Sequence, residues 1–403
     1  MFKRNPWKGL EKDLILFVLV SAFLGFATGI TDSIMNNYFS TFNMSPYLRG
    51  GLEFPRELPG LLVVLISGLL VSMGNIRMAV LANVIGAFGL LGLGFLSPTY
   101  LTMLGSLFIY SMGIHLWMPL NSSISMSLAK EGQTGRRLGQ FSGITIAAGI
   151  VGSVLVWLGF AYWKFDFKIS YVFTFIAFII AAILLWKMNP GENKSGKKFQ
   201  WVFRKQYFLF YALSVVFGAR KQVFITFAPW VLIKVFNQPT QVFAILSIVG
   251  SLIGVLFIPL LGRSIDRFGE RKILMVEAFL LIFVCIGYGF AKEWGLGQWA
   301  LYITYACFIA DRMLMAVGMA RTTYLRKIAQ SDADVTPTLS MGISMDHIVS
   351  MTIPALGGLV WELFGYQYVF VGAAVIALIN LFMANRIKVP IFPNSNEQVQ
   401  IGQ

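Results

Sequence analysis

The sequence predicts an all-α integral membrane protein with 12 transmembrane helices, arranged as two six-helix, pseudo-symmetric halves. Three observations predict this fold class. Hydrophobic residues make up 57% of the 403 residues and charged residues only 12%, whereas a soluble domain has about 25% charged residues. The apolar residues form runs of about 20, the length that crosses a bilayer as a helix. The longest polar segment, 189–205, leaves six such runs on either side.

The predicted spans follow one another with short connections. They cover residues 14–38, 53–73, 77–97, 100–128, 139–163, 169–188, 207–235, 240–262, 273–291, 298–322, 338–361 and 366–386. The basic start leads directly into the first span without a clear cleavage site, so we expect an uncleaved helix and not a signal peptide. We expect an N-terminal half over 1–188, a basic cytoplasmic linker over 189–205 and a C-terminal half over 206–403.

The positive charges orient the chain. Of the 32 lysines and arginines, 22 fall in the segments on the same side as the N-terminus, and five fall in the segments on the other side. Cytoplasmic segments of membrane proteins carry this excess, so we expect both termini in the cytoplasm. The net charge of +14 then reflects topology, and we expect a lipid bilayer, not nucleic acid, as the partner. The inner membrane of a bacterium is the expected location.

The sequence has no pattern typical of an enzyme. It contains no Gly-x-Ser-x-Gly segment, no phosphate-binding loop and only two histidines. Its two cysteines, Cys285 and Cys307, lie within apolar runs, where they form neither a disulfide framework nor a thiolate metal site. We therefore expect a non-enzyme that has no cofactor and no resident metal, and we expect it to be a monomer.

The loop at 262–272 reads Gly-Arg-Ser-Ile-Asp-Arg-Phe-Gly-Glu-Arg-Lys. It resembles the loop motif Gly-x-x-x-Asp-Arg-x-Gly-x-Arg-Lys/Arg of the major facilitator superfamily, and it falls between the second and third spans of the second half, as that motif does. The resemblance implies secondary transport by alternating access. It also implies a latch in the outward-facing state, made by Gly262, Asp266, Arg267, Gly269 and Arg271. The two glycines would permit a tight turn.

Ionisable residues occur in several predicted spans, where each costs several kcal/mol unless it meets a partner or a wet cavity. Arg220 and Lys221 lie in the middle of the run 207–235. If the resemblance holds, spans 1, 4, 7 and 10 line the central path. These spans contain Asp32, Asn36, Asn37, His115, Asn121, Arg220, Lys221, Gln222, Asp311 and Arg312.

Three central cations, Arg220, Lys221 and Arg312, face three acids, Asp32, Asp311 and Asp346. This balance argues against a purely cationic substrate. We expect Arg220, Lys221, Arg312, Asn36 and His115 to bind solute, and Asp32, Asp311, Asp346 and Glu57 to respond to protons.

The function predicted is secondary active transport of a small anionic or zwitterionic solute, for which proton coupling is one option. Two other functions stay open. One is proton-driven efflux of apolar compounds, in which the charges only couple or pack. The other is export of a divalent metal. A purely structural role for Arg220 and Lys221, as a buried ion pair that fixes helix packing, also stays open.

Acidic residues also lie near the starts of other spans. The second span must begin near Glu53 to be long enough to cross the bilayer. Arg56 is three residues and Glu57 four residues beyond Glu53, so the three side chains can share a helix face. They form either an outer gate or an ordinary charged helix start. Glu277 is five residues beyond Lys272, and we expect it to pair with the basic loop. Asp346 and His347 are adjacent and point about 100° apart, so one can face the cavity while the other meets a neighbouring helix.

Overall fold

The computed structural model describes residues 6–69, 73–130, 133–189 and 204–388, and within these ranges the regular structure is entirely helical. The helices are α1 (Pro6–Ser40), α2 (Pro46–Gly51), α3 (Glu53–Leu69), α4 (Asn75–Phe95), α5 (Tyr100–Ser127), α6 (Thr134–Tyr162), α7 (Phe167–Trp186), α8 (Phe208–Lys234), α9 (Thr240–Phe290), α10 (Gln298–Ala316), α11 (Gly318–Ile328), α12 (Asp332–Phe364) and α13 (Tyr366–Asn385). A short 3₁₀ helix, η2 (Lys205–Tyr207), precedes α8.

The helices confirm the predicted membrane fold. Within the described residues, ten helical stretches are long and apolar enough to cross a bilayer. One of them, α9, has 51 residues and is interrupted at Gly269, where φ is 80° and ψ is 159°, so it represents two spans. The helix α3 accounts for the second predicted span, and α10 with α11 accounts for the tenth. Most of the predicted linker lies outside the described residues, and the boundaries at 188 and 206 stay a prediction.

Side-chain caps fix the starts of two helices on the side predicted to be external. The Thr99 hydroxyl accepts a hydrogen bond from the Thr102 backbone amide, and the Thr102 hydroxyl accepts one from the Thr99 amide, so α5 begins with a capping box. Asp166 accepts a hydrogen bond of 2.8 Å from the Ile169 amide at the start of α7. The predicted starts at residues 100 and 169 are therefore correct to within two residues.

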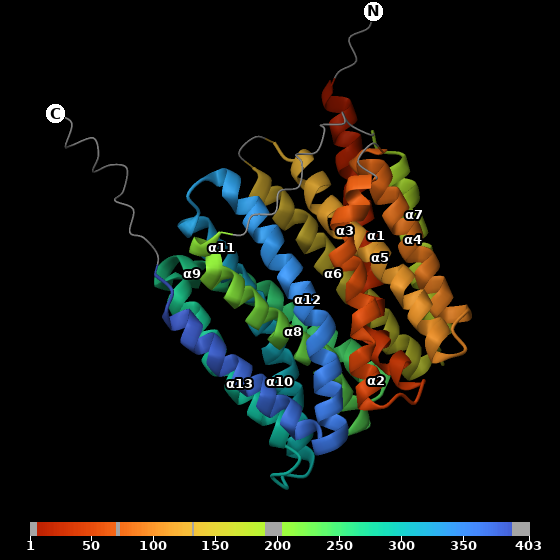
Figure 1. Cartoon of the computed structure of the whole chain (residues 1–403). Coiled ribbons are helices and arrows are strands. Elements are labelled where there is room, and N and C mark those ends of the chain that lie inside the picture. The colour runs from red at the N-terminus through yellow and green to blue at the C-terminus, as the bar shows by residue number, and fades with distance from the viewer. Residues whose placement is uncertain (1–5, 70–72, 131–132, 190–203, 389–403) are drawn as a thin grey trace, which may run out of the picture.

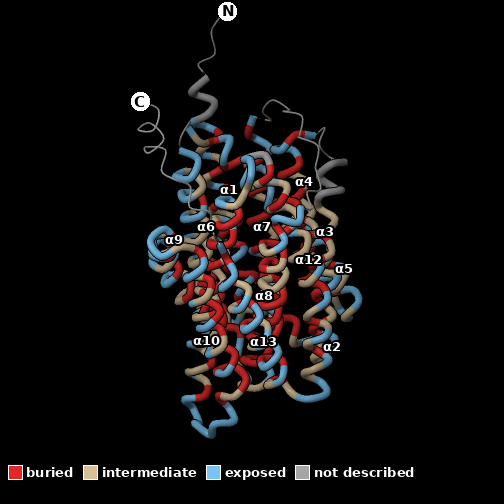
Figure 2. The backbone as a smooth tube through the Cα atoms, turned by 60° about the vertical axis from the view of Figure 1, so that its left-hand side comes forward, coloured by how far each residue is buried: buried red, intermediate tan, exposed pale blue. Residues whose placement is uncertain are grey.

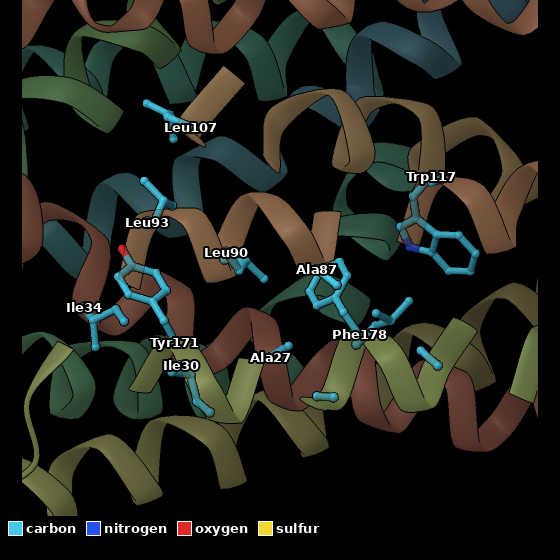
Figure 3. Close-up of a cluster of buried hydrophobic side chains, with 14 of the residues drawn as sticks. Ala27, Ile30, Ile34, Ala87, Leu90, Leu93, Leu107, Trp117, Tyr171 and Phe178 are labelled. Atoms are coloured by element: carbon cyan, nitrogen blue, oxygen red, sulfur yellow. The ribbon is translucent and has the colours of Figure 1, made fainter. Parts of the chain in front are cut away.

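The first helices pack around α1 and α4. The helix α1 contacts α6 and α7, and α4 contacts α5 and α7. Their shared core includes Ile34, Leu90, Leu93, Tyr171 and Phe178, which lie close together in Figure 3. Gly29 of α1 meets the backbone of α6 at Gly149 so closely that no side chain fits. Close approach through small residues is how membrane helices gain packing contacts without a hydrophobic driving force.

The later helices form a second group, in which α8 contacts α12 and α13, and α9 contacts α10 and α13. Three aromatic rings connect this group. Tyr288 of α9 stacks on Phe370 of α13 with ring centroids 4.9 Å apart, and Phe224 of α8 meets both rings edge-on. The two groups lie side by side in Figure 1.

Exposed residues are found along the outer helices and at the two ends of the bundle (Figure 2). On α9 the exposed residues Leu252, Leu256 and Leu260 recur every four positions, so they form one apolar stripe along the helix. Such a surface is unfavourable in water and favourable against lipid chains. The packing thus agrees with insertion in a bilayer.

The two groups make their tightest described contact where α2 meets α12, at the lower end of Figure 1. Gly50 lies against the Pro354 carbonyl oxygen, and Gly358 lies against the Pro46 carbonyl oxygen, so that neither position has room for a Cβ atom. The Tyr47 amide also donates a hydrogen bond of 3.2 Å to the Glu362 carboxylate. At this end of the bundle α2 and α12 therefore pack backbone against backbone.

Candidate functional site

Glu53 is the centre of a polar cluster in which Arg49 and Gln222 are fully buried and Arg56 is partly exposed. Its carboxylate is 2.6 Å from Arg49 Nη1 and 3.0 Å from Arg56 Nε. Gln222 Nε2 of α8 donates a hydrogen bond of 2.7 Å to the same carboxylate, across the contact between the two helix groups. Glu53 and Arg49 are both 0% exposed, so these charges are satisfied by one another and not by water.

Asn36 joins this cluster from α1, because its side-chain oxygen accepts a hydrogen bond of 2.9 Å from Arg49 Nη2. The Arg49 guanidinium also lies over the rings of Phe39 and Trp230, at 5.4 and 5.6 Å from their centroids. Arg49 is therefore a buried residue of the contact between the helix groups, although it falls in the segment between the predicted spans 14–38 and 53–73, which was expected to be external.

A second cluster, the two-histidine cluster, consists of Glu57, His115 and His347. His347 Nδ1 is 3.0 Å from Glu57 Oε2, and His115 Nε2 is 3.9 Å from the same oxygen. Glu57 lies on α3, His115 on α5 and His347 on α12, so the cluster joins both helix groups. Arg56 also approaches Glu57, with 3.4 Å between Nη2 and Oε1. Both histidines of the chain thus meet one carboxylate.

Asp346, the neighbour of His347, faces a different partner. Both of its carboxylate oxygens accept hydrogen bonds of 2.8 Å from Lys221 Nζ, and Ser350 donates a further one of 3.1 Å. The Lys221 and Asp346 side chains are 17% and 19% exposed, so water reaches this pair. Asp346 and His347 thus meet different partners, as the angle between adjacent helical residues allows.

Arg220 lies within a network that is closed to solvent. Its Nη2 is 3.1 Å from Asp311 Oδ1 and its Nε is 3.5 Å from Glu277 Oε1. Asn380 of α13 donates a hydrogen bond of 2.9 Å to the other Glu277 oxygen. The Arg220 side chain is only 2% exposed, so in this conformation no solute reaches it. Glu277 was expected to pair with the basic loop; its contact with Arg220 contradicts that expectation.

Arg312 and Asp32 form the most open of the central ion pairs. Arg312 Nη2 of α10 is 3.6 Å from Asp32 Oδ2 of α1, and the two side chains are 36% and 50% exposed. Arg312 also donates a hydrogen bond of 3.2 Å to the Ser247 hydroxyl of α9. The pair is long for a charge-assisted hydrogen bond, which measures about 2.7–2.9 Å. Both charges therefore keep capacity for another partner.

The predicted latch has one clear turn residue. Gly269 has a positive φ and interrupts α9, whereas Gly262 is within a helical stretch, so the expected turn at Gly262 is wrong. Arg271 donates a hydrogen bond to Asn385 of α13, and Asp266 and Arg267 are exposed.

Glu270, the residue after Gly269, forms an ion pair with another helix. The buried carboxylate of Glu270 is 2.7 Å from Lys327 Nζ of α11. The latch motif thus places a carboxylate against α11 through a residue that the sequence motif did not single out.

A cavity of about 620 Å³ lies apart from these ion pairs. It opens at one end of the first helix group, between α1, α4, α5 and α7, and its lining includes Tyr38, Ser97, Tyr100, Asp166 and Lys168. None of the predicted solute-binding residues contributes to its lining. This cavity is therefore not the predicted solute site, although it is large.

The sequence model of the protein family described as Major Facilitator Superfamily matches residues 17–333 of the chain. No curated protein matches the chain. Among solved structures, the fold is similar to that of a variant of the nucleoside transporter NupG, with a TM-score of 0.76 and 16% identity over 92% of this chain and 98% of that chain.

Two further solved structures have a similar fold. A bacterial homologue of the human lysosomal transporter Spinster has a TM-score of 0.71 at 15% identity, covering 93% of this chain and 96% of that chain. A D-xylose–proton symporter has a TM-score of 0.69 at 15% identity, covering 95% of this chain and 98% of that chain. At such low identity these similarities describe the fold alone.

Proposed function

Because the chain belongs to the Major Facilitator Superfamily, we propose that it is a secondary active transporter of a small zwitterionic or anionic solute. Solute would bind between the two helix groups, and the groups would rock about it so that the site opens to one side of the membrane at a time. The packed α2–α12 contact is one of the places that must separate in such a cycle.

The open Asp32–Arg312 pair is the observation that carries the proposal. It connects α1 of the first helix group to α10 of the second, and both side chains are at least one-third exposed within apolar helices. A guanidinium binds a carboxylate through two parallel hydrogen bonds, and the Asp32 carboxylate offers a matching site for an ammonium group. A zwitterion would satisfy both charges at once.

Lys221 and Asp346 provide a second contact of mixed charge, also partly open to water. Their hydrogen bonds of 2.8 Å are shorter than the Asp32–Arg312 separation, so a solute would displace them less readily. We therefore assign the first solute contact to Arg312 and Asp32 and a secondary one to Lys221. Arg220 would act through the shape of the site, by holding α8 against α9 and α10.

Asp32 is also the best placed of the predicted acids to respond to protons. Its exposure gives protons access, and its pairing with Arg312 means that protonation would release the guanidinium. Protonation and solute binding would then be linked at one pair of side chains. Asp311 is less suited, because it is enclosed with Arg220.

A two-stage experiment tests the proposal. Purified protein is first screened for solutes that raise its apparent thermal stability, because a ligand that binds the folded state stabilises it. Hits are then measured for uptake into proteoliposomes. We expect zwitterionic or anionic hits, and we expect Arg312→Gln and Asp32→Asn to raise KM by about 10- to 100-fold, the effect of losing one hydrogen bond to a charged group.

The matched control is Arg386→Gln, at the exposed end of α13, which should transport normally. The proposal is contradicted if only apolar compounds bind and their movement is unchanged in both central variants. That result would favour efflux of apolar compounds, with the charges serving packing.

A further inference from the structure

The two-histidine cluster has the composition of a metal site. One ligand atom from each of Glu57, His115 and His347 lies within 4.8 Å of the other two, and in the described part of the chain no other group of three ligands meets this test. Tetrahedral zinc binds nitrogen and carboxylate oxygen at about 2.0–2.2 Å, which places neighbouring ligands about 3.3 Å apart. The separations of 3.0 and 3.9 Å bracket that value.

The hydrogen bonds around His115 leave its Nε2 nitrogen free to bind a metal ion. His115 Nδ1 lies 2.9 Å from the Ser111 carbonyl oxygen, which can only accept, so this nitrogen carries the proton. Nε2 then presents its lone pair toward Glu57. An imidazole held through one nitrogen by a backbone carbonyl, with the other nitrogen on the metal, is the usual outer-shell arrangement of zinc-binding histidines.

Access and ligand chemistry narrow the choice of ion. The side chains of His115, His347 and Glu57 are 11%, 14% and 9% exposed, so the cluster is enclosed and yet touched by water. Two imidazoles and a carboxylate suit zinc and its neighbours, whereas magnesium and calcium prefer oxygen ligands. Arg56 next to Glu57 opposes a cation, so we expect moderate and not extreme affinity.

We propose that Glu57, His115 and His347 bind a divalent transition metal such as Zn²⁺, and that the bound ion holds α12 against α3 and α5. The ligands come from both helix groups, and a cycle that separates these helices would have to break the coordination. The ion would thus arrest transport and would not be its cargo. The metal site does not depend on the proposed function. Only the arrest of transport rests on the proposed function.

The chain contains only two histidines, which makes a direct test possible. Full-length protein, purified without a histidine tag and labelled with ¹⁵N-histidine, is titrated with Zn²⁺ while the imidazole signals are followed by NMR. We expect one equivalent to bind and both imidazole signals to change together. A titration that leaves either imidazole unchanged overturns the site.

Variants identify the ligands. Glu57→Gln, His115→Gln and His347→Gln should each weaken Zn²⁺ binding by at least about 10-fold, a loss seen even when an outer-shell partner is removed. Asn83→Ala, on α4 outside the cluster, is the control and should bind as the unmodified chain does. Thermal unfolding without metal establishes that each variant is folded. Unchanged affinity in all three folded ligand variants overturns the assignment.

Transport gives the second readout. In proteoliposomes, Zn²⁺ should slow solute exchange by the unmodified chain and have little effect on His347→Gln. Accumulation of zinc inside the vesicles would overturn the arrest, because the ion would then be cargo. If no solute is transported at all, the proposed function fails, while the NMR titration still decides the metal site.

Discussion

Arg220 and Lys221 are adjacent in the sequence, but the helix turns them about 100° apart, and they meet different surroundings. Arg220 is enclosed with Asp311 and Glu277, whereas Lys221 reaches Asp346 in a position that water touches. The first arrangement is suited to holding helices together. The second leaves a charge available for exchange with another partner.

Removing the Arg220 charge should therefore affect stability strongly. In Arg220→Ala, Asp311 and Glu277 would remain buried without their cation, and breaking a buried ion pair in this way costs about 3–5 kcal/mol. We expect a large drop in the thermal unfolding temperature of the purified protein. Arg312→Ala is the control. Its partner Asp32 is half exposed to solvent, so losing the arginine should lower the unfolding temperature much less. Equal losses in the two variants would contradict the structural role of Arg220.

At the level of single residues, the sequence predicted which charges are central but not how they pair. The three-residue spacing of Glu53 and Arg56 correctly indicated a shared helix face. Arg49 escaped notice because it precedes the predicted span, and its burial depends on α2, Trp230 and Asn36 folding over it. Glu277 was placed with the nearest basic segment in sequence, whereas its partner is on another helix. An ion pair between residues on two different helices leaves no local pattern in the sequence.

Among the elements, α2 and α12 govern how closely the two helix groups meet. Gly50 and Gly358 permit contact between backbones, which gives packing but little tolerance for added atoms. The sequence predicted the long helices because a span needs about 20 apolar residues. It did not predict the six-residue α2 or the break between α10 and α11, since such short features follow from packing.

Gly358→Ala should weaken the closed contact, because the new methyl group would collide with the Pro46 carbonyl. We expect the population to shift toward conformations in which α2 and α12 are farther apart. Spin labels at Leu48 and Leu363, both exposed, would report this as a longer distance by pulsed electron paramagnetic resonance, after both native cysteines are replaced. Gly372→Ala, which has open space around it, is the control. A distance distribution unchanged from the control would contradict the role of this contact.

Across the whole molecule, polar contacts connect the two helix groups at several depths. Gln222 reaches Glu53, His347 reaches Glu57, and Arg312 reaches Asp32. These contacts differ in burial, from the enclosed Glu53 to the open Asp32, so they do not resist separation equally. The open pair is the one that a solute or a proton can occupy without first breaking a buried network.

Linkage of protons to solute at Asp32 predicts dependence on the proton gradient. Collapsing the pH gradient across proteoliposomes should abolish accumulation of solute above its external concentration while leaving exchange intact. Asp32→Asn should lose this dependence, because its amide cannot bind and release a proton in this way. Undiminished accumulation by the unmodified chain after collapse of the gradient would contradict proton coupling at Asp32.

Counterflow tests the central claim most directly, because it requires one site that is exposed alternately to the two sides. Proteoliposomes loaded with unlabelled solute from the stability screen are diluted into a trace of labelled solute, with no ion gradient. We predict transient accumulation of label by the unmodified chain and by Arg386→Gln, and much less by Arg312→Gln when the solute concentration is near the KM of the unmodified chain. Label that only equilibrates, or equal accumulation in Arg312→Gln, would contradict alternating access at the Asp32–Arg312 pair.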